Sequence, residues 1–346
     1  MNSPLPNRNM TGHGTRRVSA STASIAASST SACRSPASAF RPGWLSRPLG
    51  RRHERAANAS GASTRTHPPC RRKPIPKSAS KNRRASAAAG RGRSMAQAKF
   101  EKRGGLVAGA GGGMGLAIAN GLIEGGADIV LADIKPEPDG IAEGPGRALY
   151  VQGDLSDEEF VKDAVARVQA HAGRFDYLVN TVGVWWGEKD VSVVDIERDV
   201  WDRVFDINLG SMMLTARHAV PAMQAAGGGS ILLISSIQAL RGDLLAQDAY
   251  GATKGAIRSL SKSLAIQFAA DNIRCNAILP GYVRTEMTYR LDEDPVRAEE
   301  MRGLIPLKRF GSVADIAGPG LFLLSGAAAF IAGAELIVDG GTTALP

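Results

Sequence analysis

Seven short apolar runs, separated by segments of helical pattern, constrain the fold of this chain more than any other feature. Each run is apolar throughout, which is typical of strands in a parallel sheet whose two faces are both covered by helices. The pattern predicts an α/β fold with a doubly wound, seven-stranded parallel sheet in a single domain. The predicted strands lie at residues 104–110, 127–133, 147–154, 175–183, 229–235, 273–281 and 334–341.

The N-terminal part of the chain differs in composition from the rest. The first 100 residues hold 20 of the chain's 42 Lys and Arg residues but only one of its 33 acidic residues, Glu54. Ser, Ala, Arg and Pro dominate there, and such a composition cannot bury enough apolar surface to offset chain entropy. We therefore predict a disordered basic extension over residues 1–98 and a folded, net acidic domain over residues 99–346.

Three interpretations of this extension stay open. The one we favour is that translation starts at Met95, just before the first predicted strand, which leaves a compact one-domain length. The Arg- and Ser-rich, acid-poor composition also matches an organelle transit peptide. Thirdly, a basic tail can contact nucleic acid or an anionic membrane through phosphates. The favoured interpretation predicts a cytoplasmic protein without nucleic acid as a partner.

The folded part has no sequence pattern for a metal site or a membrane span. Cys33 and Cys70 lie in the extension and Cys275 stands alone, which excludes a disulfide framework and zinc-ligand spacing. The uncharged run at 316–334 contains Pro319 and four glycines, which favours a helix, a turn and the start of a strand. We therefore expect no metal and no membrane insertion.

Glycines cluster directly after the first predicted strand. Gly109, Gly113 and Gly115 are spaced G-x3-G-x-G between a strand and a helix. Such glycines permit the tight turn and the close backbone approach that a pyrophosphate needs at a helix N-terminus. Asp133 ends the second strand, where a carboxylate accepts from a ribose 2′-hydroxyl and repels a 2′-phosphate. We predict a dinucleotide cofactor, NAD in preference to NADP, although nearby Lys135 leaves NADP open.

Tyr250 and Lys254 lie four residues apart in a predicted helix and therefore share one of its faces. A Lys ammonium beside a phenol favours the phenolate and lowers the pKa of the tyrosine towards a range useful for proton transfer. Taken alone, the spacing is better explained by an ordinary exposed Tyr–Lys pair. Ser236 favours the catalytic interpretation, because it follows a buried strand at the ligand-binding edge and can hold a substrate oxygen there.

With these motifs in order, residues 104–341 resemble the short-chain dehydrogenases/reductases, whose single domain has a Rossmann-type sheet, and are similar to 3-oxoacyl-carrier-protein reductases among them. Asn208 in FDINLGS completes a match to the family's catalytic tetrad with Ser236, Tyr250 and Lys254. The resemblance implies an NAD(P)-dependent oxidoreductase that interconverts a secondary alcohol and a ketone by hydride transfer. The motifs assign cofactor contacts to Gly109, Gly113, Met114, Gly115, Asp133, Asp154, Leu155, Asn180, Gly183, Tyr250, Lys254, Pro280, Gly281, Val283 and Thr285.

The resemblance also implies a role for each catalytic residue. Tyr250 acts as the general acid in reduction and as the base in oxidation, and Ser236 orients the substrate oxygen. Lys254 lowers the pKa of the tyrosine and binds the nicotinamide ribose, while Asn208 organises a water that joins Lys254 to solvent. The assembly implied is a homotetramer formed through the long helices at 195–226 and 249–270.

Three departures from the family pattern bear on cofactor geometry, and none removes a catalytic group. Ala108 replaces a threonine that ties the glycine turn. The usual Asn-Asn-Ala-Gly segment is Asn180-Thr181-Val182-Gly183. The segment 134–146 is too rich in Pro and Gly for the usual full helix.

The sequence constrains the substrate less. Carrier-protein reductases dock an acidic partner on basic residues and commonly use NADPH, whereas the loop 221–230 has no Lys or Arg. We therefore expect a small alcohol, sugar, polyol or cyclic ketone, with 3-oxoacyl-carrier-protein reduction by NADPH as the alternative. An inactive NAD-binding regulator and a nucleic-acid-binding protein are alternatives of other classes, and the intact tetrad argues against the former. The candidate substrate-binding residues are Trp185, Gln238 and Arg241.

Overall fold

All seven predicted strands form one sheet in the computed structural model, which describes residues 100–243, 245–291 and 294–345. Every strand pair is parallel, and the strand order is β3-β2-β1-β4-β5-β6-β7. The prediction of a Rossmann-type α/β fold is thereby confirmed. The strands are β1 (Gly104–Ala108), β2 (Asp128–Asp133), β3 (Ala148–Gln152), β4 (Tyr177–Asn180), β5 (Gly229–Ile234), β6 (Ile273–Pro280) and β7 (Glu335–Val338).

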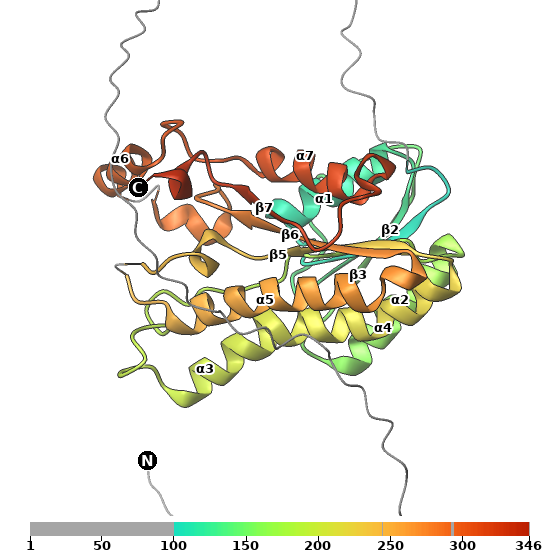
Figure 1. The fold of residues 1–346 in the computed structure, drawn as a ribbon, viewed down its shortest axis with the longest axis horizontal. Helices are drawn as coiled ribbons and strands as arrows, with labels where there is room; N and C mark the ends of the chain where they lie inside the picture. The colour runs from blue at the N-terminus through green and yellow to red at the C-terminus, as the bar shows by residue number, and fades with distance from the viewer. Residues whose placement is uncertain (1–99, 244, 292–293, 346) are drawn as a thin grey trace, which may run out of the picture. The chain divides into compact units, whose positions relative to one another are not determined.

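Helices cover both faces of this sheet (Figure 1). Two helices, α1 and α7, pack against each other on one face, and α2, α4 and α5 cover the other. The long helices are α1 (Gly113–Glu124), α2 (Glu158–Ala172), α4 (Ser211–Ala225), α5 (Asp248–Gln267) and α7 (Val313–Leu324), and shorter ones are α3 (Arg198–Phe205) and α6 (Pro295–Leu304).

The buried apolar side chains form two clusters, one on each face of the sheet. Leu106 and Val107 are neighbours on β1 and both are fully buried, yet they belong to different clusters. The same holds for Leu178 and Val179 on β4. Successive strand residues point to opposite faces, so a sheet covered on both sides requires the uninterrupted apolar runs seen in the sequence.

The strand order reverses between β1 and β4. From β1 the chain continues outwards to β2 and β3, whereas from β4 it continues to β5, β6 and β7. Connections on the two sides of this point diverge, and ligands of such sheets bind in the resulting crevice at the carboxyl ends of the strands. The glycine loop after β1, residues 181–183 after β4, and Ser235 and Ser236 after β5 all lie at this edge.

Three segments between the strands can be compared with the helices and turns predicted for them. Residues 134–146 contain no helix, which agrees with the prediction that their Pro and Gly content prevents the usual full helix. The predicted helix at 195–226 is α3 and α4, joined by a π-helical turn at Asp206–Gly210. The uncharged run at 316–334 is the end of α7, a 3-10 turn and the approach to β7.

None of the helices in the described part of the chain has the length and apolar character that crossing a bilayer requires. The predictions made for the extension at 1–98, including a start at Met95, lie outside the described residues.

Candidate active site

The glycine loop turns β1 into α1 and leaves the helix N-terminus open. Gly109 and Gly113 have φ angles of 83° and 54°, a region that glycine adopts without strain. Gly115 is required for close packing, because a Cβ there would lie 2.1 Å from the carbonyl oxygen of Gly109. α1 has no side-chain cap, so no side chain occupies its first N–H groups. The loop therefore fits a pyrophosphate.

Asp133 lies at the end of β2 beside this loop. Its Oδ2 accepts a hydrogen bond from the backbone N–H of Gly111 at 2.8 Å, and its Oδ1 accepts from that of Lys135 at 3.0 Å. Each carboxylate oxygen keeps an acceptor position for a ribose hydroxyl. The Lys135 ammonium forms an ion pair with Glu286, which follows β6. Glu286 thus already pairs with Lys135, the cation that would favour a 2′-phosphate.

Thr181 supplies the hydroxyl that is missing at position 108. Its Oγ1 donates to the carbonyl oxygen of Gly109 at 2.9 Å and lies 3.2 Å from that of Ala108. The bond joins the end of β4 to the glycine turn across the point of strand reversal. Two of the departures from the family pattern, at Ala108 and Thr181, are therefore coupled.

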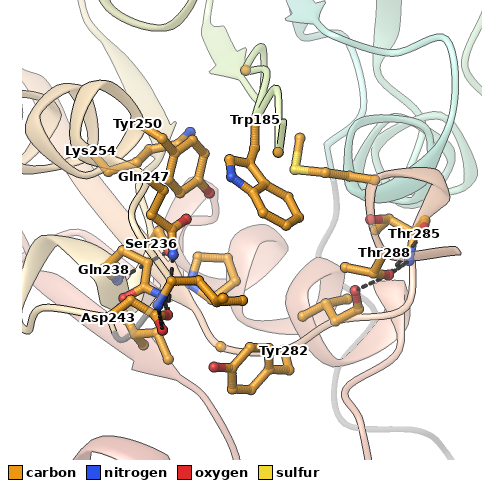
Figure 2. Close-up of a pocket in the computed structure, with 18 of the residues that line it drawn as sticks. Trp185, Ser236, Gln238, Asp243, Gln247, Tyr250, Lys254, Tyr282, Thr285 and Thr288 are labelled. Carbon is orange, nitrogen blue, oxygen red and sulfur yellow. Dashed lines mark hydrogen bonds between the residues drawn. The ribbon is translucent and has the colours of Figure 1, made fainter. Parts of the chain in front are cut away.

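Ser236, Tyr250 and Lys254 converge on one cavity at the carboxyl end of β5 (Figure 2). Lys254 Nζ lies 5.4 Å from the centroid of the Tyr250 ring. The Lys254 side chain is buried, and its ammonium donates to the carbonyl oxygen of Ile234 at 3.1 Å. The Ser235 hydroxyl donates to the carbonyl oxygen of Lys254 at 2.7 Å, which ties α5 to the end of β5.

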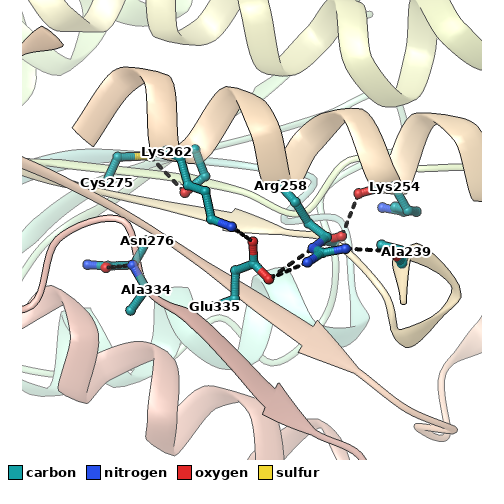
Figure 3. Close-up of polar contacts among 10 residues, drawn as sticks. Ala239, Lys254, Arg258, Lys262, Cys275, Asn276, Ala334 and Glu335 are labelled. Carbon is teal, nitrogen blue, oxygen red and sulfur yellow. Dashed lines mark hydrogen bonds and ion pairs between the residues drawn. The ribbon is translucent and has the colours of Figure 1, made fainter. Parts of the chain in front are cut away.

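An ion-pair network holds α5 against the edge strand β7 (Figure 3). Arg258 donates to Glu335 Oε2 through two N–H groups at 2.9 and 2.7 Å, and to the carbonyl oxygen of Ala239 at 2.7 Å. Lys262 pairs with the other oxygen of Glu335 at 2.5 Å. Because Arg258 lies one turn after Lys254, the network fixes the part of the helix that carries Tyr250 and Lys254.

Asp190, from the loop after β4, caps the start of α5. This helix has no side-chain cap of its own. The buried Asp190 carboxylate accepts hydrogen bonds from the backbone N–H groups of Ala249 at 3.0 Å and Tyr250 at 2.8 Å. Asp248 accepts from the N–H of Val193 at 2.7 Å, so the same loop is bound to the helix start twice. The sequence analysis did not identify Asp190.

Asn208 lies in the π-helical turn and is buried. Its Nδ2 donates to the carbonyl oxygen of Val184 at 3.0 Å and to Thr253 Oγ1 at 3.1 Å, while its Oδ1 accepts from the N–H of Val184 at 2.7 Å. Thr253 in turn donates to the carbonyl oxygen of Tyr250 at 2.8 Å. The amide thus connects the loop after β4 to α5, and its role in organising a water stays a prediction.

Burial governs the protonation of Tyr250 and Lys254. Burial raises the pKa of Tyr250, and a hydrogen bond with Ser236 partly opposes the rise. The pKa of Tyr250 is therefore raised, and not lowered as the sequence predicted. Burial also lowers the pKa of Lys254 to about 8. Both directions have one cause, since loss of hydration disfavours the charged form of either group.

The cavity has a volume of about 480 Å³ and brings most of the predicted residues together. Trp185 and Gln238 line it, as predicted for substrate-binding residues, and Asp243 and Gln247 add polar groups that the sequence analysis missed. No local motif marks these two, because they lie in the irregular segment between β5 and α5. The predicted cofactor residues on the wall, besides Tyr250 and Lys254, are Met114, Gly183, Pro280, Gly281, Val283 and Thr285.

Arg241 does not line this cavity. It lines a neighbouring cavity of about 470 Å³, and its guanidinium donates to the hydroxyl of Tyr282 at 3.2 Å. Asp243, two residues further along the chain, accepts hydrogen bonds from the side-chain amides of Gln238 and Gln247. Tyr282 lines both cavities. Arg241 and Gln238 thus line different cavities, although the two residues are close in sequence.

Three further predicted cofactor residues have internal partners. The Asp154 carboxylate pairs with Arg203 at 2.9 Å and accepts from Ser156, and Leu155 is buried in the core. The buried Asn180 amide donates to Thr215 Oγ1 at 3.0 Å and accepts from the N–H of Val182 at 2.9 Å. Their side chains hold the ends of β3 and β4 in place, and cofactor contacts by these residues stay a prediction.

Across residues 100–243, 245–291 and 294–345, no group of three or more His, Cys, Asp or Glu side chains is arranged to hold a metal ion.

Comparisons with known proteins cover almost the whole described region. A family model described as enoyl-(acyl carrier protein) reductase matches residues 109–343. The cis-4-hydroxycyclohexanecarboxylate dehydrogenase of Sinomonas cyclohexanicum is 36% identical over 250 residues, which cover 71% of this chain and 98% of that protein. The NAD-dependent glycerol dehydrogenase of Listeria innocua is 37% identical over 243 residues, covering 69% and 92%. A solved short-chain type dehydrogenase/reductase from Mycobacterium ulcerans has a TM-score of 0.66 and 32% identity, covering 71% of this chain and 91% of that one.

Proposed function

Because the chain belongs to the short-chain dehydrogenase/reductase family, we propose that Ser236, Tyr250 and Lys254 carry out its alcohol–ketone chemistry. The chain is an NAD(P)-dependent oxidoreductase that acts on CH–OH groups. One observation carries the proposal: the three side chains converge on a cavity whose wall also includes Met114 and Thr285 beside the glycine loop. Cofactor and substrate therefore share this space.

Each of the three side chains has a position that suits one task. The Tyr250 hydroxyl gives its proton to a carbonyl oxygen during reduction and takes a proton from an alcohol during oxidation. The Ser236 hydroxyl holds the same oxygen. Lys254 uses one N–H on the Ile234 carbonyl and keeps two for ribose hydroxyls. The nicotinamide, when bound, supplies or accepts the hydride.

The glycine loop and Asp133 fit a dinucleotide and favour NAD. The uncapped start of α1 and the glycine loop would hold the pyrophosphate, and Asp133 would accept from the adenosine ribose. A 2′-phosphate would approach the Asp133 carboxylate, and the ion pair with Glu286 weakens the compensation that Lys135 offers. We therefore expect NAD to be the preferred cofactor.

A homotetramer and a cytoplasmic location also belong to the proposal. Met213 on α4 and Ile266 on α5 are exposed apolar side chains on the two helices through which we expect assembly. Analytical ultracentrifugation of the full-length chain would measure its mass. A species of four chains supports the proposal, and a monomer contradicts it.

Absorbance at 340 nm tests the catalytic proposal. The full-length protein is supplied with NAD or NADP and secondary alcohols, and in reverse with NADH or NADPH and ketones or 3-oxoacyl thioesters. We expect turnover of alcohols with NAD, and a loss of about a hundredfold or more in Tyr250→Phe. Turnover restricted to NADPH and thioesters would contradict the cofactor preference, and full activity of Tyr250→Phe would contradict the role of the tyrosine.

A further inference from the structure

Two polar atoms of the cavity wall lack a hydrogen-bond partner in the part of the chain that the structure describes. The Nε1 of Trp185 and the Oε1 of Gln238 are buried, and neither makes a hydrogen bond within the described residues. Both residues line the same cavity as Ser236 and Tyr250, as Figure 2 shows. A buried donor or acceptor left unpaired is unfavourable. A bound molecule that contacts either atom would supply the missing partner.

The neighbour of Gln238 determines which way its amide points. Its NH2 group donates to Asp243 Oδ2, which also accepts from Gln247 Nε2 at 3.1 Å. A carboxylate only accepts hydrogen bonds, so the amide cannot be flipped and Oε1 remains an acceptor. Asp243 Oδ1 accepts from the N–H of Leu245 at 3.3 Å and keeps a further acceptor position. This side of the cavity thus requires donors from a ligand.

The charges on the wall disfavour an anionic substrate. Among the described residues, three carboxylates line the cavity, those of Glu188, Asp243 and Asp294, against the cations of Arg297 and Lys254. Figure 2 shows Asp243 in the cluster of Gln238 and Gln247, on the same side of the cavity as Ser236. A substrate carboxylate in this space would be repelled by Asp243, whereas a substrate hydroxyl would donate to it.

We propose that the cavity selects a neutral substrate with hydroxyl groups beyond the one that reacts, a polyol or a sugar, over a monohydric cyclic alcohol or a hydroxy acid. This inference concerns the substrate of the proposed alcohol–ketone chemistry and rests on it. The reacting hydroxyl lies at Ser236 and Tyr250. A second hydroxyl donates to Gln238 or Asp243, and a third accepts from Trp185 Nε1. A monohydric alcohol has only the reacting hydroxyl and makes no hydrogen bond with Gln238, Asp243 or Trp185.

Matched substrates test the selection. With the full-length protein and NAD, kcat/KM is compared for cyclohexanol, cyclohexane-1,2-diol, 4-hydroxycyclohexanecarboxylate, glycerol, inositol and several aldohexoses. We expect the best polyol or sugar to exceed cyclohexanol and the hydroxy acid by about tenfold or more, because each added hydrogen bond is worth about three- to tenfold. A value for cyclohexanol or the hydroxy acid equal to or above every polyol overturns the inference.

Two neighbouring tryptophans provide a matched pair of variants. Trp185→Phe keeps an aromatic ring and removes the indole N–H, and we expect it to raise KM for the polyol about fivefold while cyclohexanol changes less than about twofold. Trp186 does not line the cavity and has Lys189 over its ring, so Trp186→Phe should leave both substrates unchanged. Equal effects of Trp185→Phe on the polyol and on cyclohexanol would show a role in packing alone and overturn its part in selection.

Binding distinguishes failure of this inference from failure of the proposed function. If no alcohol is turned over with either cofactor, the proposed function fails. Calorimetry with the Tyr250→Phe protein still compares the affinity for polyols with that for cyclohexanol. Tighter binding of a polyol, weakened about fivefold by adding Trp185→Phe, supports the inference without turnover. Equal or tighter binding of cyclohexanol overturns it.

Discussion

Replacing Asp190 with alanine should loosen the start of the helix that carries Tyr250. The buried carboxylate accepts two backbone N–H bonds, at 3.0 and 2.8 Å, in a helix that has no cap of its own. Hydrogen bonds to a charged group contribute about 1.5–3 kcal/mol each. Burial raises the pKa of Asp190, so part of that gain is offset by desolvation. We expect the free energy of unfolding to fall by about 2–4 kcal/mol.

Urea unfolding and steady-state kinetics on the same protein measure both consequences. Asp190→Asn keeps one acceptor oxygen, so we expect about half the loss of stability. Asp248→Ala is the control, because this exposed carboxylate lies at the same helix start with its bond directed to Val193, and its loss should cost about 1 kcal/mol or less. In Asp190→Ala we expect kcat to fall about tenfold through misplacement of Tyr250, because a shift of about 1 Å can cost a hundredfold.

Two results would refute this reasoning. One is an Asp190→Ala protein that is as stable as Asp248→Ala. The other is an Asp190→Ala protein that is destabilised as expected but keeps the wild-type kcat, since Asp190 would then stabilise the loop without positioning the tyrosine.

Three further predictions concern the residues that we propose bind the cofactor. Gly115→Ala places a Cβ 2.1 Å from the Gly109 carbonyl oxygen and should abolish NAD binding measured by calorimetry, and retained binding would contradict the packing argument. Gly303→Ala in α6, whose added Cβ would meet nothing within 4 Å among the described residues, is the control and should gain about 0.5–1 kcal/mol in urea unfolding. The Lys254 pKa of about 8 means that its charged, ribose-binding form is lost as pH rises from 7 to 9, so NAD affinity measured by fluorescence should fall about tenfold, and a flat profile would argue against this role. Asp133→Asn should raise the NADP/NAD ratio of kcat/KM about tenfold or more by removing the charge that faces a 2′-phosphate, and an unchanged ratio would remove the basis for the NAD preference.

The strands, and the convergence of Ser236, Tyr250 and Lys254 on one cavity, could be predicted because their signals are local. Each strand of a sheet covered on both faces must be apolar throughout, and the two clusters that meet on β1 show why. The glycine loop and the pair of Tyr250 and Lys254 each depend on spacing within a single turn or helix. Ser236 was identified because it follows directly after a predicted strand, at the edge where ligands bind.

The remaining site residues depend on contacts between distant segments. Asp190 caps a helix that begins 58 residues later in the chain, and no capping pattern precedes that helix in the sequence. Thr181 replaces a hydroxyl from another strand, which requires knowledge that β1 and β4 are adjacent. Arg241 was expected beside Ser236 and Tyr250 but lines the neighbouring cavity, because the path of the segment after β5 and the position of Tyr282 between two cavities are tertiary features.

The most direct test of hydride transfer assisted by Tyr250 follows a deuterium atom from the alcohol to the cofactor. The full-length protein is incubated with NAD and a secondary alcohol that carries deuterium on its carbinol carbon, and the reduced cofactor is analysed by mass spectrometry. We predict one deuterium in every reduced cofactor formed by the wild-type protein, at a rate at least about a hundredfold lower in Tyr250→Phe. Release of the deuterium to solvent, or an equal rate in Tyr250→Phe, would contradict hydride transfer assisted by this tyrosine.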